Sequence, residues 1–137
     1  MILIDAGPLV ALFDRRDQDH ARCVTTLQSI REPAYTTVAV LAEAFHILGP
    51  ASIGAAALRD LVLSGSVGIW FFDLGAVSRA FELMDTYSDH PMDLADASIV
   101  VAAETLSTHK VFTLDVGDFQ TYRVRRGHRH EPFEIVP

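Results

Sequence analysis

Strand-sized apolar runs alternate with helix-length segments along this 137-residue chain, and this alternation limits its possible folds more than any other feature. The apolar runs lie at residues 2–5, around Tyr35, and at 67–72, 111–114 and 133–136. Helices are predicted between them at 8–13, 21–30, 38–48, 52–65, 75–87 and 94–106. Strands that are separated by helices usually pair in parallel. The pattern therefore predicts an α/β domain with a parallel, largely covered central sheet.

Several local signals fix the ends and faces of these helices. Thr37 and Ser52 are predicted N-caps, and Pro8 suits the first helical position. Segment 94–106 is apolar nearly all round, so we expect a buried helix. One face of the helix at 75–87 is expected to carry Val77, Ala80, Phe81 and Met84.

Length and composition predict one domain spanning residues 1–137, because half of the residues are hydrophobic. The longest apolar runs fall far short of the roughly 20 residues that a membrane span needs. The N-terminus lacks the basic region of a signal peptide, so a cytoplasmic protein is expected. Cys23 is the only cysteine, which excludes an internal disulfide and a thiolate metal cluster.

Four carboxylates stand in unusual places, inside or at the end of strongly apolar segments: Asp5, Glu43, Asp96 and Asp115. Burying an ionised carboxylate without a partner is costly. Cations are too few to pair all four, since 11 Lys and Arg face 18 Asp and Glu, and Lys110 is the only lysine. A shared divalent metal is the economical explanation. Asp5 and Asp115 are also expected at the carboxyl ends of strands, where open parallel sheets bind ligands.

Each acid also has a structural interpretation. Asp5 could accept hydrogen bonds from the first turn of the next helix. Glu43 could be partly exposed between apolar faces, or it could pair with His46. A capping arrangement accounts better for Asp93 than for Asp96, which makes Asp96 the preferred ligand.

The acids near the last predicted motif have similar alternatives. Asp115 and Asp118 could stabilise the turn around Gly117. Asp115 has the strand-end position, so Asp118 is expected to be structural or to support the site. Thr113 could orient a carboxylate or a water by a hydrogen bond.

Oxygen ligands of this kind suit Mg²⁺ or Mn²⁺, and the chemistry that unites them is metal-assisted hydrolysis of a phosphodiester. The six histidines show no zinc-site spacing, and neither a Gly-x-Ser-x-Gly elbow nor a glycine-rich phosphate loop occurs. The net charge of −7 argues against non-specific nucleic-acid binding by the whole surface, but it does not exclude a local basic patch.

Four acidic motifs follow one another in a specific order: Ile2-Leu3-Ile4-Asp5-Ala6-Gly7-Pro8, Glu43 within its helix, Met92-Asp93-Leu94-Ala95-Asp96-Ala97, and Val111-Phe112-Thr113-Leu114-Asp115. Together they resemble the PIN-domain family, and within it the VapC-like toxins of bacterial toxin–antitoxin pairs. The resemblance spans almost the whole chain. It implies a three-layer α/β/α domain with a mostly parallel central sheet, and a metal-dependent endoribonuclease that acts on RNA.

The resemblance also implies site residues and partners. Asp5, Glu43, Asp96 and Asp115 match the acidic quartet that holds Mg²⁺ or Mn²⁺, and Asp93 and Asp118 are nearby acids that could contribute. The family often carries Thr or Ser just after the first aspartate, whereas this chain has Ala6 and Gly7. A homodimer is implied, together with inhibition by a cognate antitoxin whose tail lies in or over the active groove.

Two basic clusters are candidates for contacting RNA phosphates. Arg15 and Arg16 form the first, and Arg123, Arg125, Arg126 and Arg129 form the second. The alternative is that both are simply solvated polar loops.

Two other functions fit parts of the sequence. A PIN-like module that binds RNA or a protein without cutting would explain the missing hydroxyl after Asp5 and the negative net charge. A phosphoacceptor receiver domain shares the size and the strand-end acids, but the apolar surroundings of Glu43 do not suit it.

Overall fold

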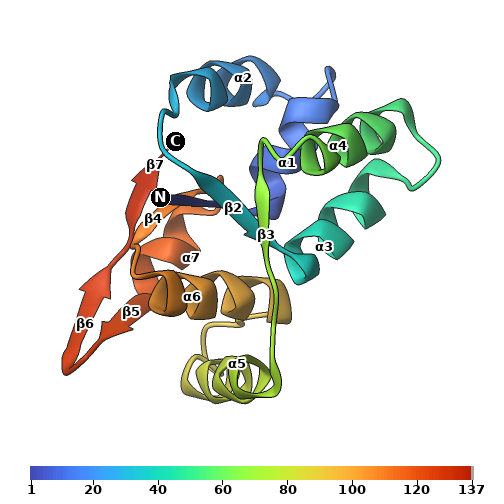
Figure 1. The fold of residues 1–137 in the computed structure, drawn as a ribbon. Coiled ribbons are helices and arrows are strands. Elements are labelled where there is room, and N and C mark those ends of the chain that lie inside the picture. The colour runs from blue at the N-terminus through green and yellow to red at the C-terminus, as the bar shows by residue number, and fades with distance from the viewer. Residues whose placement is uncertain (137) are drawn as a thin grey trace.

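A five-stranded sheet forms the centre of the computed structural model, which describes residues 1–136 (Figure 1). Its strands are β1 (Ile2–Ile4), β2 (Ala34–Thr37), β3 (Gly68–Trp70), β4 (Lys110–Phe112) and β7 (Glu134–Val136). The strand order is β3-β2-β1-β4-β7, and every neighbouring pair is parallel. Pro137, the last residue of the expected domain, lies outside the described residues.

Helices cover both faces of this sheet, as the sequence predicts. On one side lie α1 (Ala6–Phe13), α2 (His20–Ser29) and α4 (Ile53–Leu63), and on the other lie α5 (Leu74–Thr86) and α6 (Leu94–Leu106) (Figure 1). The remaining helices are α3 (Val38–Leu48), which contacts both α1 and α6, and α7 (Val116–Thr121). The strand order differs from the 2-1-3-4-5 order of flavodoxin-like sheets, which receiver domains share. The receiver interpretation is therefore wrong.

The predicted helix starts on either side of α3 are confirmed. The Thr37 side chain accepts a hydrogen bond from the Val40 amide at 3.2 Å, and that of Ser52 accepts one from Ala55 at 3.0 Å. Gly49 ends α3 with φ 85°, a conformation that favours glycine. Helix α6 is buried along most of its length, as expected.

Other expectations need correction. Helix α1 begins at Ala6 rather than Pro8, because first-turn amides have no helical partner and proline is tolerated there. Phe81 is 56% exposed; of the four residues expected on one face of α5 only Ala80 is fully buried, and Ala76 and Leu83 are buried beside it. The strand expected at 111–114 ends at Phe112.

One helix and one hairpin of two strands were not expected from the sequence. Helix α7 follows Asp115, and a second, two-stranded sheet pairs β5 (Arg123–Arg126) with β6 (Arg129–Pro132) in an antiparallel hairpin. Gly127 lies in its turn with φ 61°. Within residues 1–136, no helix is both long and apolar enough to cross a membrane.

Helices α1 and α4 lie close together at Gly54. A Cβ atom built there would lie 2.4 Å from the Phe13 carbonyl oxygen, so the two helix backbones could not stay at their present separation. Gly117 in α7 has nothing within 4 Å of the same position. The two helical glycines therefore differ in the space around them.

We expect Gly54→Ala to destabilise the protein by roughly 1–3 kcal/mol, because overpacking outweighs the gain of up to about 1 kcal/mol in helix propensity. Gly117→Ala is the matched control and should be neutral or stabilising. Urea denaturation of both variants measures the two changes. A Gly54→Ala protein as stable as the control would contradict the close approach.

Candidate active site

The four acids from the apolar segments meet at the carboxyl-end edge of the sheet. Asp5 directly follows β1, and Asp115 lies three residues beyond β4. Glu43 lies in α3, and Asp96 lies in the first turn of α6. All four line one hollow of about 300 Å³, whose wall is completed by Ala6, Gly7, Ile47, Pro91, Asp93 and Asp118.

Asp5 is the most buried of these acids, with 3% of its surface exposed. Its Oδ2 accepts a hydrogen bond of 2.8 Å from the Thr113 hydroxyl, whose oxygen also accepts one of 3.0 Å from the Asp115 amide. Asp5 also donates its own amide to the Phe112 carbonyl at 3.0 Å. Thr113 thereby joins the two acids at the ends of β1 and β4.

Three acids occupy N-cap positions, but they differ in how the side chain is used. Asp5 precedes α1 and Asp115 precedes α7, and neither side chain makes a capping hydrogen bond. Asp93 caps α6, with Oδ1 accepting from the Asp96 amide at 2.8 Å. The expected cap at Asp93 is confirmed. Asp5 makes no such cap, but its carboxylate accepts a hydrogen bond from the amide of Ala6, the first residue of α1, so its expected contact with the first helical turn is present.

Asp96 also takes part in the cap of α6. Its Oδ2 accepts from the Asp93 amide at 3.3 Å, which completes a capping box. The same oxygen accepts a hydrogen bond of 3.3 Å from the Tyr122 hydroxyl. Both Asp93 and Asp96 therefore take part in the cap, so capping alone does not distinguish a structural Asp93 from a ligand Asp96.

Sequence reasoning missed two residues that contact the acids. His90 Nε2 lies 2.7 Å from Asp118 Oδ1, and Tyr122 contacts Asp96 as described above. These pairs are separated by 28 and 26 residues, so no local spacing connects them.

Burial and mutual repulsion raise the pKa values of the acids. Burial raises the pKa of Asp5 to about 6, because its effect outweighs the hydrogen bonds from Thr113 and the Ala6 amide, which lower the pKa. The charges of Asp115 and Glu43 add smaller increases. Burial raises the pKa of Asp96 to about 7, and the charges of Asp93 and Asp5 add to the shift. The pKa values of Glu43 and Asp115 also rise, chiefly because both are partly buried. The lining of this hollow contains six carboxylates and no Lys or Arg among residues 1–136.

This donor set fits a hard, oxygen-seeking cation such as Mg²⁺ or Mn²⁺. In the part of the chain that the structure describes, no three His, Cys, Asp or Glu side chains are arranged to hold an ion among themselves. Mg²⁺ keeps several waters and often takes only one or two carboxylates directly. The remaining acids would then act on the hydrated ion through its waters and its charge.

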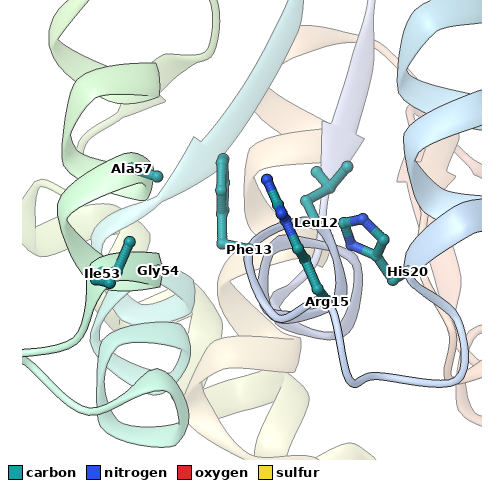
Figure 2. A pocket seen from close by; sticks show the side chains of 7 residues that line it. All are labelled: Leu12, Phe13, Arg15, His20, Ile53, Gly54 and Ala57. Carbon is teal, nitrogen blue, oxygen red and sulfur yellow. The ribbon is translucent and has the colours of Figure 1, made fainter.

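The first basic cluster borders a series of adjoining hollows. Arg15 lies beside Phe13 and His20 in a cavity between α1, α2 and α4, with Ile53 on the opposite wall (Figure 2). Arg16 lines a second hollow, which shares Phe13, Ile53 and Gly54 with the first and Ile47 with the acidic one. Their role in RNA binding stays a prediction.

The second cluster lies on and beside the β5–β6 hairpin. One Arg123 guanidinium nitrogen donates to three carbonyls at the end of α7, those of Gln120, Thr121 and Tyr122. The Arg125 amide donates to Glu104, and Arg126 pairs with Glu131 at 3.4 Å. None of these arginines lines the acidic hollow, and their contact with RNA also stays a prediction.

Comparisons with known proteins agree with the fold. The family model described as PIN domain matches residues 2–124. The chain is 27% identical to Ribonuclease VapC26 of Mycobacterium tuberculosis over 139 residues, which covers 99% of this chain and 100% of that protein.

Among solved structures, the chain is similar to Mycobacterium tuberculosis VapC20, described as a sarcin-ricin loop cleaving toxin. The TM-score is 0.79 at 18% identity, covering 86% of this chain and 92% of that one. It is also similar to VapBC2 of Rickettsia felis bound to a promoter DNA fragment, with a TM-score of 0.68, 15% identity and full coverage of both chains. FitAcB of Neisseria gonorrhoeae gives a TM-score of 0.61 at 23% identity, covering 87% of this chain and 91% of that one.

We expect Asp5→Asn to stabilise the metal-free protein increasingly as pH rises. The pKa of Asp5 is about 6 when folded, against 3.8 as its ordinary value, so the folded state binds the extra proton between these values. Stability from this group is therefore present below pH 4 and lost above pH 6. In EDTA at pH 8 the variant should exceed the wild type by roughly 1–3 kcal/mol, since one pKa unit is about 1.4 kcal/mol.

Urea denaturation at several pH values between 4 and 8 measures this difference. Asp60→Asn, which changes an exposed acid of α4, is the matched control and should give no trend with pH. A gap between Asp5→Asn and the wild type that is the same at both pH extremes would contradict the assigned cause.

Proposed function

The chain belongs to the PIN-domain family, and from this membership we propose that it is a metal-dependent endoribonuclease of a toxin–antitoxin pair. The observation that carries the proposal is the gathering of Asp5, Glu43, Asp96 and Asp115 around one hollow. These residues come from four separate motifs, and no requirement of the fold alone would bring them together. The relative named Ribonuclease VapC26 supports the same activity.

The proposed substrate is itself an anion. An RNA phosphate cannot approach six carboxylates closely without a cation between them. When bound, Mg²⁺ or Mn²⁺ supplies an activated water and neutralises charge that develops on the phosphoryl oxygens.

We assign the ion to Asp5, Glu43, Asp96 and Asp115, with Asp93 and Asp118 as additional acids at the wall. Asp5 is the fixed member, because burial and the hydrogen bond from Thr113 restrict its carboxylate. Asp5 and Asp96 hold protons more readily than ordinary aspartates, so any proton on either carboxylate would have to leave before that carboxylate could hold the cation. The reaction consumes one water and breaks one phosphorus–oxygen bond of the RNA backbone.

We expect purified protein to cleave RNA with Mg²⁺ or Mn²⁺ and to stop in EDTA. Asp5→Asn and Asp96→Asn should each lower the rate by at least about 100-fold, because each removes a charged ligand from the proposed ion. Asp60→Asn, an exposed control, should leave the rate unchanged. Gel analysis of RNA fragments, together with calorimetric titration of Mn²⁺, measures both steps.

Two results would reject this function. Cleavage that persists in EDTA and in both site variants would arise from other chemistry or a contaminant. Intact RNA binding without Mn²⁺ binding or cleavage would instead identify a non-cleaving module, the alternative motivated by Ala6 and Gly7.

We further propose that a cognate antitoxin restrains cleavage and that the protein forms a homodimer. The VapBC and FitAcB structures, similar in fold, are toxin–antitoxin complexes. The hollow that Arg16 lines shares Ile47 with the acidic one, and we assign the antitoxin to it. Ile53, which also lines this hollow, is 91% exposed. A second exposed apolar group around β3 is available to the dimer: Val38, Phe71, Leu74 and Leu94.

We expect Ile53→Asp to weaken inhibition by the antitoxin at least tenfold, because a buried unpaired charge would oppose apolar contact. Cleavage by the free chain should not change. Leu63→Asp is the control, since Leu63 lies at the other end of α4 and is 84% exposed. Titration of the antitoxin into the cleavage reaction measures the effect, and equal inhibition of both variants would place the antitoxin elsewhere.

A further inference from the structure

His90 holds Asp118 from outside the acidic hollow. Its Nε2 lies 2.7 Å from Asp118 Oδ1, and each side chain is 40% exposed. Asp118 lines the hollow, whereas His90 reaches it from the turn that follows α5. The imidazole is therefore a neighbour of the proposed metal site without being part of its wall.

An aromatic support fixes the imidazole in this place. The His90 ring packs edge-on against the Tyr122 ring, with 5.9 Å between centroids and 83° between planes. Tyr122 is fully buried and packs in the same way against Tyr87 and Phe119. Its hydroxyl donates to Asp96. One buried tyrosine thus supports contacts to two of the acids.

Asp118 needs such a restraint because its neighbours repel it. The charge of Asp118 raises the pKa values of both Asp96 and Asp115, so the three carboxylates feel one another's field. A partly exposed aspartate under this repulsion would rotate toward solvent. The hydrogen bond from His90 opposes that rotation.

We propose that His90 is a positioning residue, which keeps the Asp118 carboxylate at the wall of the hollow so that it contributes to cation binding. This inference rests on the proposed function, because it assumes that the hollow binds Mg²⁺ or Mn²⁺. Asp93 has a different role, since its Oδ1 caps α6. The two additional acids therefore have different roles: the Asp118 carboxylate contributes to cation binding, and the Asp93 carboxylate caps α6.

Calorimetric titration of Mn²⁺ at one fixed pH tests the role of His90. His90→Phe keeps a ring against Tyr122 but removes the hydrogen bond, and it should weaken Mn²⁺ binding about tenfold, as loss of an outer partner of a metal ligand commonly does. His90→Gln places a donor near the position of Nε2 and should restore most of the affinity. In an Asp118→Ala background, His90→Phe should have no further effect, because the residue acts only through Asp118.

His109→Phe is the matched control. His109 is also 40% exposed and lies 3.7 Å from a carboxylate, that of Glu134, but at the opposite edge of the sheet. It should bind Mn²⁺ as the wild type does, and thermal melting of every variant checks that the fold is kept.

The results distinguish failure of the positioning role from failure of the proposed nuclease function. Unchanged Mn²⁺ affinity in His90→Phe, or an equal loss with and without Asp118, would overturn the positioning role while leaving the nuclease proposal intact. A wild-type protein that binds no Mn²⁺ would overturn the proposed function and this inference with it.

Discussion

Asp5 is placed where a folded chain would ordinarily put a neutral side chain, at the end of the central strand and with 3% of its surface exposed. Its carboxylate accepts hydrogen bonds from the Thr113 hydroxyl and the Ala6 amide, neutral donors that offset only part of the cost of burial. The raised pKa of about 6 measures the part that remains. Each further carboxylate around the hollow adds to the same uncompensated negative charge, so the acids raise one another's pKa values.

The helix N-termini around the hollow reduce the cost of burying these charges, although not every carboxylate makes a capping hydrogen bond. Asp5, Asp93 and Asp115 stand at the N-cap positions of three helices, whose positive ends favour a negative charge. Only Asp93 uses its side chain as a cap. Asp5 and Asp115 thus gain from the helix dipole, while their carboxylates remain available to a ligand in the hollow.

Much of this fold could be predicted because its signals are local. Thr37 and Ser52 mark helix starts because each side chain accepts a hydrogen bond from an amide three residues later. Helices α3 and α6 have the predicted bounds. The hairpin and α7 were missed because neither shows a clear apolar period in the sequence. Phe81 was placed on the buried face of α5 from periodicity alone, which cannot tell how much of a helix its neighbours cover.

The acids of the candidate site could be chosen from the sequence, since burial of a carboxylate is visible as an acid within an apolar run. Their supports could not. His90 and Tyr122 reach Asp118 and Asp96 across 28 and 26 residues, and only the folded chain brings these pairs together. Neither residue stands in an apolar run that would have made it conspicuous.

The two arginine clusters differ in the contacts that their side chains already make within the fold. Arg123 bonds the last carbonyls of α7, so it holds in place the segment that carries Asp118 and leads into Tyr122. Arg16 instead lines a hollow that shares Ile47 with the acidic one, and Arg15 lines the next hollow along. A polyanion bound near a carboxylate-lined site needs positive charge along its path rather than at the reacting phosphate, where the proposed metal would supply it. Arg16 meets that requirement better than the hairpin arginines, because the hollow it lines shares Ile47 with the acidic one.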